Sequence, residues 1–177
     1  MRLFKTILAF VVLLILFNLL NNSQGSIPPL GKFLNPFAGF WQNGEKLDHI
    51  DEVLDVKGLR DEVQVVWDER HVPHIFAENT YDIYFAQGFL TARHRLWQME
   101  FQTHVAAGRV SEIIGEKAVE FDRLQRRRGL LMAAETTIQY MSEDPETHII
   151  LQAYANGVNA WIESLTPATL PLEYKLL

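Results

Sequence analysis

The sequence contains no cysteine among its 177 residues. This absence excludes disulfides, thiolate nucleophiles, zinc sites with cysteine ligands and lipid attachment to a cysteine. An excess of basic residues is also missing, because 16 Lys and Arg stand against 22 Asp and Glu, for a formal net charge of -6. This sign is unsuited to binding phosphate backbones, so we expect no nucleic-acid partner.

Motifs for known reaction chemistry are equally scarce. Only five serines occur, and none lies in a Gly-x-Ser-x-Gly turn that would expose a nucleophile. Ser111, which follows Gly108, is predicted to cap a helix. No HExxH pair is present, and His71 and His74 are predicted to be hydrogen-bonded histidines near a turn. The glycines are scattered singly, so no phosphate-binding loop is predicted.

The charged residues form no recognisable constellation either. The arginines between positions 123 and 128 are predicted to lie on a mixed, solvated helix face beside acids. Five carboxylates could supply a catalytic pair, but no spacing brings any two of them together, which argues against a glycosidase. These are Asp68, Asp82, Glu100, Glu112 and Asp122. We therefore assign no catalytic, substrate-binding or metal-binding residue in this sequence.

Residues 1–25 predict a targeting segment. Arg2 and Lys5 precede eleven consecutive apolar residues, and Ser23-x-Gly25 has the small residues of a signal-peptide cleavage site. Cleavage after Gly25 is the favoured interpretation. An uncleaved membrane anchor is the alternative, because residues 3–20 approach the length that spans a bilayer. Either way, we expect the rest of the protein in the periplasm or cell envelope.

The remaining chain divides into a lead-in, residues 26–60, and a main region, residues 61–177. The lead-in is rich in proline, glycine, aromatic and acidic residues, and its aromatic part is expected to lie against a protein or membrane surface. The main region predicts a mostly helical α+β fold that begins with a β-hairpin. Gly88 indicates that another backbone passes close to its first helix. The predicted strands cover 63–67 and 72–77, and the predicted helices cover 80–106, 122–135 and 145–165.

Several segments of the main region together resemble the penicillin acylase (penicillin amidase) family. They are Val-Pro-His-Ile at 72–75, Phe-Ala-Gln-Gly-Phe at 85–89, Arg-Leu-Trp-Gln-Met-Glu at 95–100, Gly-Arg-Val-Ser-Glu at 108–112 and Ala-Asn-Gly-Val-Asn at 155–159. The resemblance covers residues 63–177. Three residues depart from the family pattern. His71 replaces a usual glycine, which suggests a different turn, and Arg93-His94 replace Gln-Asp.

The resemblance implies an N-terminal nucleophile hydrolase of αββα fold, exported as a precursor that cuts itself into two chains. Only the first chain is matched here. The resemblance places the nucleophile, a serine with its own α-amino group as base, at the start of the second chain, together with an oxyanion hole. The uncapped apolar end at Leu177 indicates a chain cut within its fold. We therefore expect this fragment to be inactive and poorly folded by itself.

The implied activity is hydrolysis of a linear amide, of either the β-lactam side-chain type or the acyl-homoserine lactone type. A non-catalytic envelope protein that binds or assembles through the same fold is the alternative. No cofactor is expected in these residues, although the resemblance implies calcium in the full protein. The expected partners are the second chain of the same precursor, a small acyl amide substrate and, at the N-terminus, a membrane.

Overall fold

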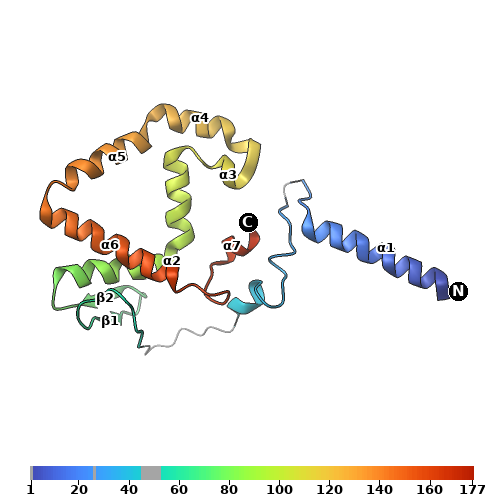
Figure 1. Ribbon diagram of the computed structural model, residues 1–177, viewed down its shortest axis with the longest axis horizontal. Coiled ribbons are helices and arrows are strands. Elements are labelled where there is room, and N and C mark those ends of the chain that lie inside the picture. The colour runs from blue at the N-terminus through green and yellow to red at the C-terminus, as the bar shows by residue number, and fades with distance from the viewer. Residues whose placement is uncertain (1, 26, 45–52) are drawn as a thin grey trace. The chain divides into compact units, whose positions relative to one another are not determined.

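The computed structural model describes residues 2–25, 27–44 and 53–177 in two units (Figure 1). One unit contains Met1–Ile50 with Leu165–Leu177, and the other contains Asp51–Ser164. Ser26 and residues 45–52, which belong to the predicted lead-in, lie outside the described residues. The second unit holds the hairpin and most of the helices, which is the predicted α+β arrangement.

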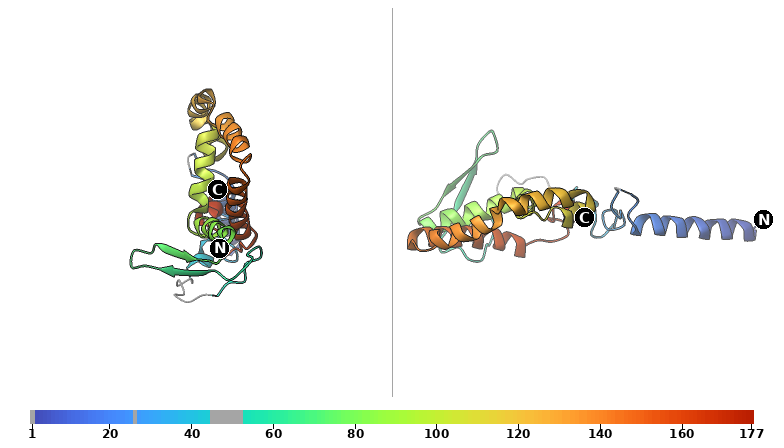
Figure 2. Two further views of the ribbon diagram at one scale, coloured as in Figure 1. Left: turned by 90° about the vertical axis from the view of Figure 1, so that its left-hand side faces the viewer. Right: turned by 90° about the horizontal axis from the view of Figure 1, so that it is seen from above.

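The hairpin forms where the sequence predicts it. β1 (Gln64–Trp67) and β2 (Pro73–Phe76) pair antiparallel, with Trp67 opposite Pro73. Pro73 is the first residue of its strand, where a missing N–H is tolerated. In Figure 2 the tip of the hairpin projects out of the layer of helices.

The turn of this hairpin contains His71, one of the departures from the family pattern. His71 has a φ of 57°, in the left-handed region that favours glycine. Histidine is among the residues that adopt this region more often than most. The histidine at this position therefore has the backbone conformation that glycine favours, so the substitution by itself does not require a different turn.

α2 (Thr80–Ala107) covers the range predicted for the first helix of the main region. The side-chain oxygen of Asn79 accepts a hydrogen bond from the N–H of Asp82 at 2.9 Å and so caps the helix. Arg95 interrupts α2 with a φ of -140° and a ψ of 24°. The two halves of α2 consequently run in different directions (Figure 1), a kink that the sequence pattern does not predict.

α2 packs along α6 (Pro145–Glu163), and two glycines allow their backbones to approach closely. A Cβ on Gly88 would overlap the carbonyl oxygen of Tyr154, and a Cβ on Gly157 would overlap that of Phe85. The close backbone approach predicted from Gly88 is therefore confirmed. The buried side chains along this pair of helices are Phe85, Ala86, Phe89, Leu90, Ala92 and Ala153.

The prediction of one helix over 122–135 is wrong. The chain forms two helices there, α4 (Val119–Arg128) and α5 (Leu130–Met141). Gly129 between them has a φ of 69°, a left-handed conformation that ends α4 and lets α5 take a new direction. Two short helical turns precede them, α3 (Ser111–Ile114) and the 3-10 helix η2 (Gly115–Ala118).

The other unit contains α1 (Arg2–Asn21), the 3-10 helix η1 (Phe40–Asn43) and α7 (Leu172–Leu176). α1 is long and apolar enough to cross a membrane, with a mean hydropathy of 2.6, and none of its residues is buried. One part of the aromatic lead-in lies against protein, because η1 contacts α7 within this unit.

Candidate functional site

Asp82 is completely buried in the first turn of α2. Its oxygens accept hydrogen bonds from the backbone N–H groups of Arg60 and Asp61, both at 2.9 Å, and from the side chain of Asn79 at 2.7 Å. Burial raises the pKa of Asp82, but these hydrogen bonds outweigh it, and the pKa lies below its usual value. Asp82 is therefore an ionised anchor that ties the lead-in to α2.

Asp122 holds a second corner of the same unit in a similar way. Its oxygens accept hydrogen bonds from the N–H groups of Val110 and Ser111, both at 2.8 Å. Burial raises the pKa of Asp122. Hydrogen bonds from the hydroxyl and N–H of Ser111 and from the N–H of Val110 lower it by more, so the pKa lies below its usual value. The carboxylate thus satisfies the first N–H groups of α3 from α4.

This arrangement corrects the prediction for Ser111. The N-cap residue of α3 is Val110, and Ser111 is the first residue inside the helix. Because Asp122 binds both N–H groups, a serine cap is not needed. The Ser111 hydroxyl is committed to Asp122 rather than to a basic group.

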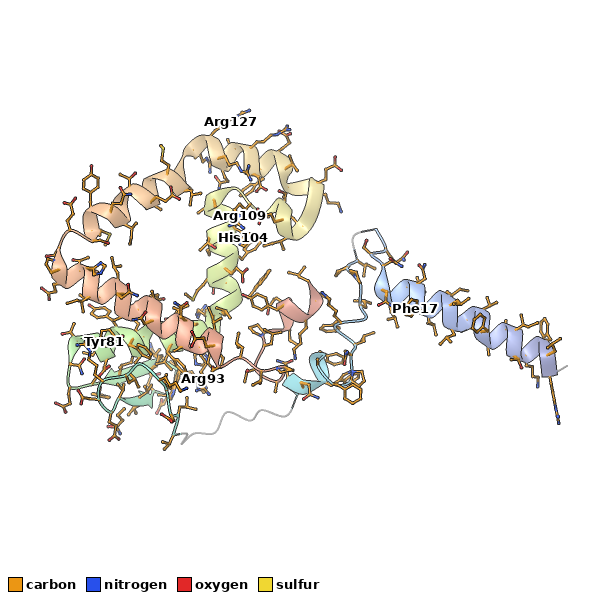
Figure 3. All side chains as sticks on the ribbon, in the orientation of Figure 1. Phe17, Tyr81, Arg93, His104, Arg109 and Arg127 are labelled. Atoms are coloured by element: carbon orange, nitrogen blue, oxygen red, sulfur yellow. The ribbon has the colours of Figure 1, made fainter. Side chains whose placement is uncertain are left out.

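A polar cluster of Glu100, His104, Arg109 and Glu112 lies beside this corner. Arg109 donates to both carboxylate oxygens of Glu112, at 2.9 and 2.7 Å, and this hydrogen bonding holds the pKa of Glu112 below its usual value. His104 approaches Glu112 to 3.8 Å and contacts the Glu100 carbonyl oxygen at 3.0 Å through Nδ1. Figure 3 shows His104 and Arg109 close together. The contacts described for this cluster pair no base with a hydroxyl nucleophile.

The arginines of α4 are only partly as predicted. Arg123 pairs with Glu120 at 2.6 Å on an exposed surface, as expected for a mixed helix face. Arg126 instead donates to the Gly108 carbonyl at 2.9 Å, and Arg128 donates to the Gln125 side chain at 2.9 Å. The Arg126 contact joins α4 to the end of α2, the Arg128 contact lies within α4, and neither guanidinium contact is with an anion.

The histidines near the hairpin turn separate into two roles. His74 lies 3.5 Å from Asp68, as predicted for a hydrogen-bonded histidine. Asp68 also accepts hydrogen bonds from the N–H groups of Val72 and Arg70, and the one from Val72 contributes most to a pKa below the usual value. His71 supplies the turn itself. No group of three metal-binding side chains occurs among the described residues.

Two of the departures from the family pattern pack α2 against its neighbours. The ring of His94 meets that of Trp67 on β1 edge to face, with centroids 5.1 Å apart. The guanidinium of Arg93 lies 5.8 Å from the ring centre of Trp161 on α6. Trp161 also has a buried indole N–H without an acceptor among the residues in the described ranges. A buried donor without a partner destabilises a fold, so this position favours an acceptor from elsewhere.

The outer helices of this unit expose a large apolar surface. A cleft of about 390 Å³ lies between the end of α2 and α4–α5, with Arg109, Gln125, Leu130 and Met132 among its lining residues. Many large apolar side chains exposed on two neighbouring helices are typical of an interface. We name it the α4–α5 surface, and its exposed members are Phe121, Leu124, Leu130, Leu131, Met132, Ile138, Tyr140 and Met141.

In the other unit, Lys175 of α7 is buried, with 4% of its surface exposed. Its ammonium group donates to the carbonyl oxygens of Gly39 and Pro167 and to the side-chain oxygen of Asn43. Burial lowers the pKa of Lys175. Sequence reasoning missed this residue, because its acceptors are mostly backbone atoms that no residue pattern reveals.

The family profile described as penicillin amidase matches residues 62–177. The matching segment carries the hairpin, the α2–α6 pair and both buried carboxylates, so the chain belongs to the penicillin amidase family. The resemblance inferred from the motifs is confirmed.

Individual relatives agree with this assignment. Penicillin G acylase of Escherichia coli is 39% identical over 111 residues, covering 62% of this chain and 13% of its own length. Penicillin acylase 2 proenzyme of Pseudomonas sp. (strain SE83) is 39% identical over 124 residues, covering 70% of this chain and 16% of its own length. Acyl-homoserine lactone acylase QuiP of Pseudomonas aeruginosa is 36% identical over 110 residues, covering 62% of this chain and 13% of its own length.

A solved structure shows the same fold. Thermostable penicillin G acylase from Alcaligenes faecalis aligns with a TM-score of 0.55 and 30% sequence identity, over 64% of this chain and 60% of that chain. The chain spans less than one fifth of the length of the curated relatives named above.

Proposed function

We propose that this chain is the N-terminal part of an amidohydrolase that releases a carboxylic acid and an amine from an acyl amide. The observation that carries this proposal is the penicillin amidase match over residues 62–177. The names of the relatives support two substrate types, penicillins and acyl-homoserine lactones. No contact among the described residues favours the non-catalytic alternative.

In this proposal the described residues build the scaffold, and a second chain supplies the chemistry. Asp82 and Asp122 are occupied by backbone donors, so neither is available as a general base. The nucleophile would be a serine that begins the second chain, with its α-amino group accepting the proton as the hydroxyl attacks the amide carbonyl. The proenzyme name of one relative supports formation from a precursor.

The second chain would bind where this part leaves apolar surface uncovered. On the α4–α5 surface, Met132 and Tyr140 are each about 70% exposed. Large side chains exposed in this way are typical of a surface that a partner covers. The buried N–H of Trp161, on α6, would find its acceptor in bound water. Burial of this surface on assembly would also explain the expected weak folding of the isolated fragment.

Calcium binding by the full protein is the next part of the proposal, and it rests on the family resemblance. Calcium is bound by six to eight oxygen atoms, several of them from carboxylates. The carboxylates in the described part of the chain do not form such a group, so they do not fit a calcium site by themselves. Ligands from outside these residues would be required.

Export is the third part of the proposal. Arg2 and Lys5 lie at the start of the 20-residue α1, before its apolar run, an arrangement that holds the N-terminus inside and directs the following chain across the membrane. The enzyme would then act in the periplasm or cell envelope.

The test is to isolate the full-length protein from the envelope of its host and to determine its intact masses and N-terminal sequences. We expect a larger chain that begins with serine and copurifies with this one. The complex should release amine from a β-lactam acyl amide or an N-acyl-homoserine lactone, and replacement of that serine by alanine should abolish the release. A copurifying chain without activity on any acyl amide would instead support the non-catalytic alternative.

A further inference from the structure

We propose that α1 remains attached as a membrane anchor and that the segment after it, residues 27–43, lies at the membrane interface. The partner is the lipid bilayer. This inference concerns how the protein is held in the envelope and does not depend on its enzymatic activity. The sequence alone favours cleavage after Gly25, whereas this inference favours a retained anchor.

The first reason is the length and exposure of α1. Its 20 residues correspond to about 30 Å of helix, the thickness of the hydrocarbon core of a bilayer. The uninterrupted apolar run of residues 7–17 has the length found in signal peptides, about 7 to 15 residues, but the helix continues past it through Leu19 and Leu20 and so reaches the length of a membrane span. Side chains all around α1 are exposed, so its apolar surface is uncovered on every side. In Figure 3 the side chain of Phe17 projects from the helix.

The second reason is the structure around the expected cleavage point. Gln24 and Ile27 exchange two backbone hydrogen bonds, at 3.0 and 3.1 Å, and Gly25 between them has a φ of 63°. An extended peptide bound by another protein uses these same backbone groups. A peptidase would therefore have to open this turn. The N–H of Gly31 also donates to the Leu20 carbonyl at 2.7 Å, which ties the chain back to the end of α1.

The third reason is the set of aromatic side chains that follows α1. Phe37 is 84% exposed and Trp41 is 57% exposed, although Phe33 and Phe40 stack beside them with ring centres 4.9 Å apart. The indole N–H of Trp41 donates to the Leu34 carbonyl at 3.4 Å, which leaves an apolar ring with its polar group satisfied. Aromatic rings of this kind collect at the headgroup level of membranes.

The fourth reason is that residues 27–43 are part of the fold and not a free linker. The side chain of Asn43 donates to the carbonyl oxygens of Ala168 and Leu170, at 3.4 and 3.0 Å, and accepts from Lys175. Removal of α1 would leave the exposed apolar side chains of this docked segment in water. A bilayer covers both α1 and these side chains at once.

The experiment follows the N-terminus of the full-length protein in a Gram-negative host. Membrane and soluble fractions are separated, membranes are washed with alkaline carbonate, and both fractions are digested with trypsin. Cleavage after Lys5 and Lys32 yields the peptide 6–32 if α1 is retained, whereas signal removal after Gly25 yields the peptide 26–32. We expect the peptide 6–32 in carbonate-washed membranes.

A matched variant calibrates this result. The double substitution Ser23→Ala and Gly25→Ala creates an Ala-x-Ala site, and alanine disfavours the positive φ of the turn. This variant is expected to give the peptide 26–32 in the soluble fraction. The peptide 26–32 from the unsubstituted protein, or release of its uncleaved form by carbonate, would overturn the proposal. Acyl amide hydrolysis by the released form would leave the proposed function intact.

Discussion

Gly157 of α6 lies against the carbonyl oxygen of Phe85 in α2, in a space too small for any side chain. Gly88 of α2 lies in the same way against the Tyr154 carbonyl of α6. The two contacts are reciprocal, because each helix contributes one glycine and one carbonyl. They set the separation of the two helices that carry the core of this unit.

Substitution of either glycine by alanine is therefore expected to force the helices apart. We expect Gly88→Ala and Gly157→Ala each to destabilise the full-length protein by about 3 kcal/mol, because a backbone oxygen cannot move aside as a side chain can. Urea unfolding measures the change. Gly44→Ala is the control, since its nearest neighbour would be 3.5 Å from the new Cβ. Equal effects at the three positions would refute the close-packing argument.

Asp82 and Asp122 are expected to make the fold sensitive to acid. Their pKa values are lower in the folded protein than the usual value of about 3.9, so their stabilising contribution is complete above that pH. It is lost as the pH falls through the folded-state values. Urea midpoints measured from pH 7 to pH 3 should decline below about pH 4. The decline should be smaller in Asp82→Asn and Asp122→Asn, and unchanged in the exposed control Glu143→Gln. An equally steep decline in all variants would assign acid sensitivity to other groups.

Lys175 is expected to hold the lead-in on α7. In Lys175→Met the acceptors of Gly39, Asn43 and Pro167 lose their donor, at a cost of about 2 kcal/mol for buried oxygen atoms left unpaired. Limited proteolysis of the full-length protein should then cut residues 27–43 faster. The exposed Lys57→Met serves as control. Unchanged cleavage in Lys175→Met would show that the lead-in is held by other contacts.

His71 provides a test of the hairpin turn. Its φ of 57° is strongly disfavoured for a β-branched residue, so His71→Val is expected to destabilise the protein by about 1 to 2 kcal/mol. His71→Gly is expected to be at least as stable as the unsubstituted protein, because glycine adopts this φ without strain. Thermal unfolding of the two variants makes the comparison. A glycine variant as unstable as the valine variant would mean that the imidazole itself holds the turn.

Predictions from the sequence succeeded where the signal is local. The alternation around Val65 and the position of Pro73 indicate the hairpin, and Asn79 followed by Asp82 indicates the start of α2. Gly88 reveals a close backbone approach because a glycine inside a long helix has a cost that only packing offsets. The family was also accessible, since its motifs are short contiguous blocks.

Other features were misread even though the relevant residues were in view. Gly129 ends α4 through its positive φ, yet the surrounding residues favour helix on both sides, so one helix was predicted. Serine is a residue type that often caps helices, but at Ser111 the Asp122 carboxylate already binds the N–H groups that a cap would bind. In both cases the local preference was real and the neighbouring structure decided the outcome.

The sequence by itself determined the family, the hairpin, the starts of the long helices and the apolar character of α1, because each depends on residues near one another in the chain. Only the tertiary structure decided which charged groups are buried and what they bind. Asp82 meets a backbone N–H 22 positions away, Asp122 one that is 12 positions away, and Lys175 a carbonyl that is 136 positions away. Backbone donors and acceptors are the same in every residue, so no sequence pattern marks the ones that folding brings to these charges.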